Sequence, residues 1–110
     1  MAKDYHIGYL IDFYGSLLTD RQREVISLYY EEDLSLSEIA DDVGITRQGV
    51  RDAIKKAETI LTEAEEKLGL AAKFKNLSDE ITVIKEQLLT LADRNDDVKH
   101  VIEMIDKLEI

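Results

Sequence analysis

Residues 35–53 read SLSEIADDVGITRQGVRDA, and this stretch decides the fold. Ala40 is a small residue where two helices can cross, and Gly44 supplies the turn between them because glycine takes a left-handed conformation freely. Apolar residues recur at helical spacing on the expected inner faces of both helices, at Ile39, Val43, Ile45, Val50 and Ala53. A helix-turn-helix is therefore predicted within the segment from about Thr19 to Ala57.

Polar residues mark where the helices begin. Two capping boxes are present, Thr19 with Gln22 and Ser35 with Glu38. In a capping box the hydroxyl and the longer side chain satisfy backbone N–H groups that a helix start leaves unpaired. Thr46 is a third cap, and Gly69 is a stop signal. Together these signals predict helices over about 20–32, 36–43 and 47–68.

A first helix is predicted from Tyr5 to Ser16. Its expected core stripe consists of Ile7, Leu10, Ile11, Tyr14, Leu17 and Leu18, which recur at helical spacing. Proline is absent from the 110 residues, so little interrupts helices. The predicted fold class is all-α.

Beyond Gly69 the apolar residues alternate steps of four and three, the spacing of a heptad seam: Leu70, Phe74, Leu77, Ile81, Ile84, Leu88 and Leu91. The same spacing returns at Val98, Val101, Ile105 and Leu108, after a polar stretch at 94–97 that favours a turn. We therefore expect a helix-turn-helix domain over 1–69 and a helical hairpin over 70–110. The hairpin either closes within the chain and packs on the first domain, or it forms a homodimer.

Composition limits the function. The formal net charge is −10, which repels phosphate backbones in general, so a DNA-binding surface has to be local. The chain contains no cysteine, which excludes disulfides and thiolate metal sites. No apolar run is long enough to span a bilayer and no signal-peptide core follows the N-terminus, so we expect a soluble, cytoplasmic protein without membrane insertion.

One segment is basic. Between Thr46 and Ala57 four cations oppose one anion, Asp52, which gives a net charge of +3. Thr46, Arg47, Gln48, Arg51 and Lys55 are expected on the outward face, as the candidate nucleic-acid-binding residues. Arg47 and Gln48 would reach base edges in the major groove of duplex DNA, and Arg51 and Lys55 would reach phosphates.

The competing interpretation is that these cations pair with the protein's own acids. Between Thr19 and Ile45 eight acidic residues oppose two arginines, a net charge of −6. They include Glu31, Glu32 and Asp33 before the first helix of the motif, and Asp41 and Asp42 on it. Both interpretations stay open at this point.

An enzyme is not expected. The sequence contains no phosphate-binding glycine loop, no cluster of metal-ligand residues and no nucleophile with a nearby base. His6 and His100 are isolated. We therefore predict no catalytic residue, cofactor or metal.

Several short motifs occur in order: DFYGSLLT at 12–19, LYY at 28–30, LSLSEIA at 34–40 and TRQGV at 46–50. Over roughly Tyr5 to Leu70 the chain resembles the YlxM family, whose helix-turn-helix is like region 4 of sigma factors. The C-terminal hairpin matches in character alone. The resemblance implies a role in the signal recognition particle pathway, which delivers nascent membrane proteins, with the particle's GTPase or its ribonucleoprotein as partner.

The resemblance also carries Thr46, Arg47 and Gln48 over as the start of the recognition helix. Gly49 departs from the small helix former, often alanine, that we expect there, at a cost of about 1 kcal/mol in helix propensity. Two other functions stay open. The acidic surface of the chain would bind a basic protein, such as the methionine-rich RNA-binding domain of that GTPase, or the protein is a sequence-specific transcriptional regulator unrelated to targeting.

Overall fold

The computed structural model describes residues 3–92 and 95–108. Over these residues it is all-α, as predicted, and the figures use the following helix labels. The helices are α1 (Tyr5–Tyr14), a 3-10 turn η1 (Gly15–Leu17), α2 (Asp20–Tyr30), α3 (Leu36–Val43), α4 (Arg47–Leu68), α5 (Leu70–Ala92) and α6 (Asp96–Asp106). The chain divides into two compact units, Met1–Ala71 and Ala72–Ile110. This division lies two residues beyond the predicted boundary.

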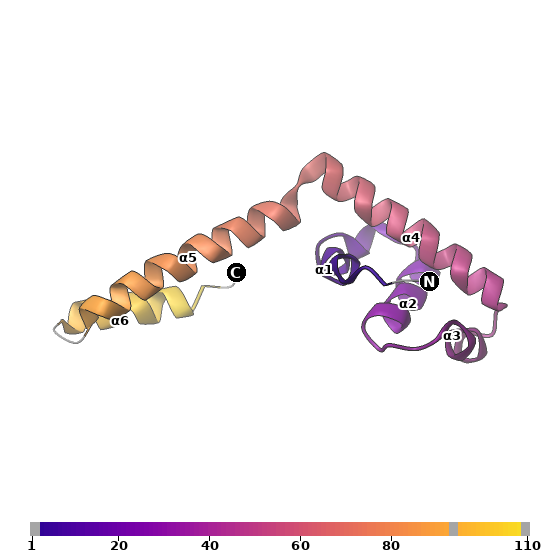
Figure 1. The fold of residues 1–110 in the computed structure, drawn as a ribbon, viewed down its shortest axis with the longest axis horizontal. Helices are drawn as coiled ribbons and strands as arrows, with labels where there is room; N and C mark the ends of the chain where they lie inside the picture. The colour runs from indigo at the N-terminus through magenta and orange to yellow at the C-terminus, as the bar shows by residue number, and fades with distance from the viewer. Residues whose placement is uncertain (1–2, 93–94, 109–110) are drawn as a thin grey trace. The chain divides into compact units, whose positions relative to one another are not determined.

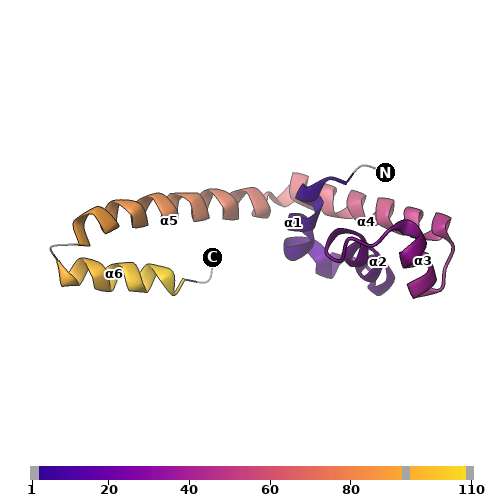
Figure 2. The ribbon, with the colours of Figure 1, turned by 60° about the horizontal axis from the view of Figure 1, so that its bottom comes forward.

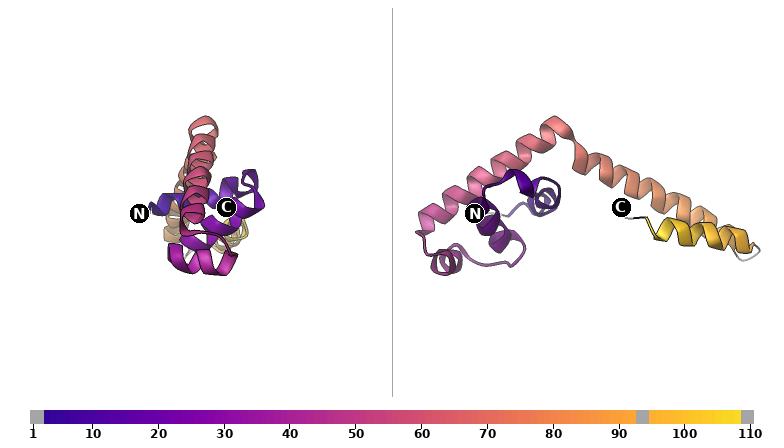
Figure 3. Two further views of the ribbon diagram at one scale, coloured as in Figure 1. Left: turned by 90° about the vertical axis from the view of Figure 1, so that its right-hand side faces the viewer. Right: turned by 180° about the vertical axis from the view of Figure 1, so that it is seen from behind.

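The first unit is organised around α4. Figures 1 and 3 show α1, α2 and α3 lying along the same side of this long helix. The core between them is continuous, and its largest fully buried side chains come from four helices: Leu10, Val25, Ile26, Ile39, Val50, Ile54 and Leu61. Burial of these side chains drives the folding of the unit and fixes α3 against the start of α4.

The predicted caps at Thr19, Ser35 and Thr46 and the predicted stops at Gly44 and Gly69 are confirmed. Both capping boxes form, with Thr19 Oγ1 accepting from the Gln22 N–H at 3.1 Å and Ser35 Oγ accepting from the Glu38 N–H at 3.1 Å. Gly44 ends α3 with φ of 79°, a left-handed conformation that disfavours any side chain with a Cβ. Gly69 ends α4 in the same way, with φ of 61°.

One prediction about the core was wrong. Leu17 was expected in the stripe of the first helix, yet its side chain is 57% exposed. The α-helix ends at Tyr14, two residues before the predicted end at Ser16, and the 3-10 turn follows. A 3-10 turn advances by about 120° per residue instead of about 100°, so it changes the phase of the stripe. The next residue, Leu18, is extended and returns to the core. The second helix ends at Tyr30, two residues before its predicted end.

A side chain from α1 closes the junction between α4 and α5. The Tyr14 hydroxyl donates to Glu65 Oε1 at 2.6 Å and accepts from the Leu70 N–H at 3.0 Å. The same Glu65 oxygen accepts from the Ala71 N–H at 3.0 Å. The first N–H groups of α5 are thus satisfied by two side chains instead of a residue next to them in the sequence. Burial, followed by the hydrogen bond to Glu65, raises the pKa of Tyr14.

Removing this hydroxyl is expected to destabilise the first unit. Tyr14→Phe keeps the ring in the core but leaves the Leu70 N–H and the Glu65 carboxylate without that partner, so the thermal midpoint falls by a few degrees. Circular dichroism melting measures the change. Tyr9→Phe is the matched control, because Tyr9 is a half-buried tyrosine on the same helix. Equal melting of wild type and Tyr14→Phe would show that the junction is held by packing alone.

Tyr30 differs from Tyr14 in the surroundings of its hydroxyl group. Its ring is buried, and its hydroxyl makes no direct hydrogen bond in the described part of the chain, while the Glu58 carboxylate lies near it. Burial, with the nearby charge of Glu58, raises the pKa of Tyr30 from 10.0 to about 12. The folded protein therefore holds this proton more tightly than the unfolded chain does. Its contribution to stability is complete below pH 10 and is lost as the pH rises toward about 12.

Tyr30→Phe is accordingly expected to leave the free energy of unfolding at neutral pH unchanged or slightly higher, because it removes a buried polar group that lacks a partner. Between pH 10 and about 12 the variant loses less stability than wild type. Urea unfolding across this pH range measures both effects. Parallel curves for the two proteins would rule out a contribution from Tyr30 ionisation.

The second unit is a helical hairpin. In Figure 2, α6 lies antiparallel beside α5, and Lys85 on α5 forms an ion pair with Asp106 on α6. Ala92 and Ile102 are its buried side chains among the described residues. The predicted turn at 94–97 was placed too late, because Asn95 caps α6 and Asp96 and Asp97 are its first residues. Arg94 lies outside the described residues.

Within the described residues, no helix is long and apolar enough to cross a membrane.

Candidate nucleic-acid interface

The start of α4 is fixed by Thr46. Its Oγ1 accepts from the Gly49 N–H at 2.9 Å, and its backbone is extended, as in a helix cap. A Cβ added at Gly49 would lie 3.1 Å from the same Oγ1 and 3.6 Å from Ile45 Cδ1. The Cβ of an alanine at this position would crowd the capping hydroxyl of Thr46. This contact gives a local reason for glycine at the one position where the sequence departs from the expected helix former.

The outward and inward faces of α4 separate as the periodicity indicates. All five candidate residues are exposed: Thr46, Arg47, Gln48, Arg51 and Lys55. On the other side of the helix Val50 and Ile54 are fully buried, and Ala53 packs against the core while half-buried. Arg47, Arg51 and Lys55 follow each other at intervals of four residues, so they form one row along the helix. We call this row, together with Thr46 and Gln48, the α4 basic face.

The acids of the protein form no close ion pair with this row. Among the described residues, no ion pair within 4.0 Å involves Arg47, Arg51 or Lys55. Asp33 instead binds Lys3, whose Nζ lies 2.7 Å from Asp33 Oδ1 and also donates to the Tyr29 carbonyl at 2.9 Å.

One acid does reach the α4 basic face. The Gln48 amide donates to Asp52 Oδ1 at 2.9 Å, one helical turn further along. This contact holds the amide against its own helix. A base edge that paired with Gln48 would have to replace the Asp52 carboxylate.

A hollow of about 350 Å³ adjoins the α4 basic face. It is lined by Arg47, Gln48 and Arg51 from α4 and by Leu36 from the start of α3. Sequence reasoning did not single out Leu36. No local pattern marks it, because its place beside the start of α4 depends on how α3 packs against that helix. The hollow offers an apolar contact next to two guanidinium groups.

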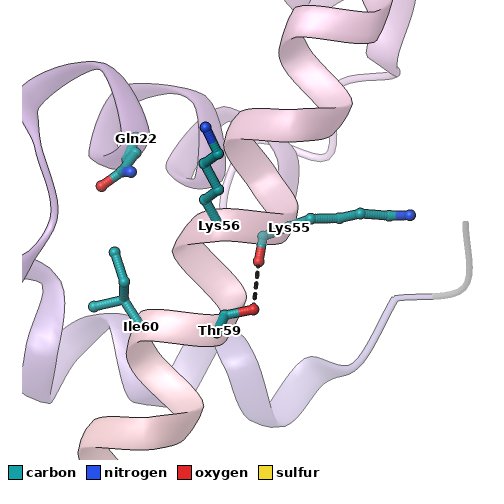
Figure 4. Close-up of a pocket in the computed structure, with 5 residues that line it drawn as sticks. All are labelled: Gln22, Lys55, Lys56, Thr59 and Ile60. Atoms are coloured by element: carbon teal, nitrogen blue, oxygen red, sulfur yellow. Dashed lines mark hydrogen bonds between the residues drawn. The ribbon is translucent and has the colours of Figure 1, made fainter.

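Figure 4 shows the end of the row at Lys55, which is the end farther from the start of α4. A second hollow, of about 370 Å³, is lined by Gln22, Lys55, Lys56, Thr59 and Ile60, and the Thr59 hydroxyl donates to the Lys55 carbonyl at 3.0 Å. The Lys55 side chain extends away from Gln22 and Ile60, whereas Lys56 lies on the side of Gln22. The two neighbouring lysines therefore point in different directions. Lys55 alone continues the row of Arg47 and Arg51.

Acidic residues lie on the neighbouring helix α3 and on the segment before it. Glu31, Glu32, Glu38, Asp41 and Asp42 are all exposed, on α3 or on the segment before it. A polyanion is therefore attracted to α4 and repelled by its neighbours. In the described part of the chain, no three His, Asp or Glu side chains are grouped so as to hold a metal ion.

The fold and this surface together define a helix-turn-helix protein. A family described as "Putative helix-turn-helix protein, YlxM / p13 like" matches residues 1–101. The chain is 43% identical over 109 residues to UPF0122 proteins of Bacillus cereus (strain AH187), Bacillus anthracis (strain A0248) and Bacillus thuringiensis subsp. konkukian (strain 97-27), with 99% of each chain covered. The protein therefore belongs to the YlxM/p13-like helix-turn-helix family.

Proposed function

We propose that this protein is a non-enzymatic accessory of the signal recognition particle pathway that contacts nucleic acid through the α4 basic face. The observation that carries the nucleic-acid contact is the row of Arg47, Arg51 and Lys55, exposed and without an ion pair within 4.0 Å among the described residues. Like charges at intervals of four residues repel each other, and phosphates relieve that repulsion. The pathway is proposed from the family resemblance.

The proposed contact uses the start of α4 as a recognition helix. Arg47 and Gln48 lie in its first turn, where the N-terminal residues of such a helix meet base edges. Arg51 and Lys55 lie one and two turns further on and would hold phosphates. The helix start also carries partial positive charge, which favours an anionic ligand. Leu36 would pack against the sugar or base beside the two arginines.

The acidic residues of α3 favour a nucleic-acid contact that is limited to α4. A protein that coats duplex DNA spreads lysine and arginine over the flanking helices, whereas α3 here is acidic. One helix against one stretch of phosphates fits a ribonucleoprotein, in which α4 meets a loop or bulge of RNA whose base edges are accessible, and the particle's basic protein component faces the acids. Duplex DNA is the second candidate ligand for the same face.

A second candidate function places the contact on the acids instead. The exposed carboxylates on and before α3 favour a basic protein surface, such as the methionine-rich domain of the particle's GTPase. In that case the helix-turn-helix is a scaffold and the α4 basic face is not used.

Recovery of partners from a bacterial lysate distinguishes these functions. The tagged protein is recovered with and without nuclease, and both the nucleic acid and the proteins that copurify are identified. The proposal predicts recovery of the particle RNA with its GTPase, both reduced by nuclease. Nuclease-resistant recovery of the GTPase supports the acidic surface. Recovery of DNA alone, lost on nuclease treatment, would contradict the targeting role and indicate a transcriptional regulator.

A further inference from the structure

The hairpin of the second unit leaves much of its heptad seam uncovered. Six apolar side chains of the hairpin are each between 42% and 60% exposed: Leu77, Ile84 and Leu91 on α5, Val101 and Met104 on α6, and Leu108 just after α6 ends. We call these six residues the apolar stripes. Pairing of α5 with α6 covers the neighbouring positions Ile81 and Leu88 only in part. The expected intrachain seam is therefore incomplete.

Both stripes emerge on the same face of the hairpin. Successive residues of an α-helix are about 100° apart around the helix axis. By this measure the α5 stripe lies roughly 80° away from the side of α5 that α6 covers. The α6 stripe lies roughly 90° away, in the same direction of rotation, from the side of α6 that meets α5. Because the two helices run antiparallel (Figure 2), equal rotations bring the stripes to one side. Lys85 and Asp106, which form an ion pair, are rotated in the opposite direction, so they lie on the other face of the hairpin.

We infer that this face binds a second copy of the chain, so that two hairpins form a four-helix bundle. The α5 stripe repeats every seven residues, as do Val98 and Ile105 on α6, and this period is typical of helices that pack against a helical partner with the same repeat. The hairpin carries such repeats on both of its helices, so two copies related by a two-fold axis are complementary to each other.

The size and the charge of the face fit this partner. At about 30 Å² per methylene, the half-exposed stripes leave on the order of 400 Å² of apolar surface per copy, close to the apolar part of a standard interface. Between the stripes lie the half-buried side chains of Ile81, Leu88, Val98 and Ile105, all of them apolar. The centre of the face is therefore apolar, while the carboxylates of Asp79, Glu80 and Asp97 lie at its edges, and depletion of charge at the centre is typical of a homodimer.

The test is the oligomeric state of matched variants by sedimentation velocity, from about 1 to 100 µM protein. Ile84→Gln with Leu91→Gln changes the stripe, and Val83→Gln with Leu89→Gln is the control, because Val83 and Leu89 are equally exposed on other sides of α5. Wild type is expected to be a dimer. The stripe variant is expected to bind its second copy at least about 100-fold more weakly, and the control within about threefold of wild type.

Circular dichroism shows whether each variant keeps its helices, which is expected because the replaced side chains are exposed within one chain. Added salt is expected to strengthen the dimer, since each copy has a formal charge of −10. A wild type that stays monomeric at about 100 µM, or a control that dissociates as much as the stripe variant, would overturn the inference.

Discussion

The variant carrying Arg47→Glu and Arg51→Glu is expected to lose at least about 100-fold in affinity for nucleic acid. The two arginines lie one turn apart in the row that carries the proposed contact, and glutamate turns each attraction for a phosphate into a repulsion. Titration of labelled signal recognition particle RNA and of duplex DNA at fixed salt measures the loss. The logarithm of the binding constant should also fall less steeply with the logarithm of the salt concentration, by the amount that corresponds to the loss of about two phosphate contacts.

The matched control is Arg21→Glu with Arg23→Glu. It changes the net charge by the same amount on the same unit, and both residues are exposed on α2, outside the row on α4. This control is expected to lose much less affinity. Equal losses would mean that overall charge decides binding. Binding of the particle's GTPase by the α4 variant at wild-type strength, without nucleic acid, would favour the acidic surface as the functional one.

Ile54→Ala is expected to cost about 2–5 kcal/mol in the free energy of unfolding of the first unit. Ile54 lies on the inner face of α4, is fully buried and belongs to the one continuous core of this unit. Truncation removes apolar contacts and leaves a cavity that the surrounding helices fill incompletely. Domains of this kind are stable by only about 5–15 kcal/mol, so a large part of the stability is lost.

Ile60→Ala is the control for this effect. Ile60 is on the same helix and packs against the same core, but it is half-buried. The same chemical change should therefore cost less, because part of the side chain already meets water. Urea unfolding followed by circular dichroism measures both variants. A cost below about 1 kcal/mol at Ile54 would contradict the central place of α4 in the core.

Much of the first unit was predictable because its signals are local. Each capping box lies within four residues, and the hydrogen bonds of Thr19 and Ser35 form as the sequence indicates. Gly44 and Gly69 stop their helices for a reason that belongs to glycine itself, its freedom at positive φ. Exposure of Arg47 and Arg51 follows from the burial of Val50 and Ile54 on the same helix.

Contacts between distant residues were not predictable. The Tyr14 hydroxyl meets Glu65 and Leu70 across more than fifty residues, and Lys3 meets Asp33 across thirty. No local pattern marks such pairs. The sequence showed the heptad seam, but it did not show which seam residues α6 covers and which stay exposed, because the spacing alone does not say which positions one partner helix covers.

The most direct test of the central claim is a photocrosslink from the α4 basic face in living cells. A photoreactive amino acid replaces Gln48, which is exposed between Arg47 and Arg51, and in a control replaces Glu63, which is exposed near the other end of α4. The account predicts nuclease-sensitive adducts from position 48 and few from position 63. Adducts to protein alone from position 48, or equal nucleic-acid adducts from both positions, would contradict it.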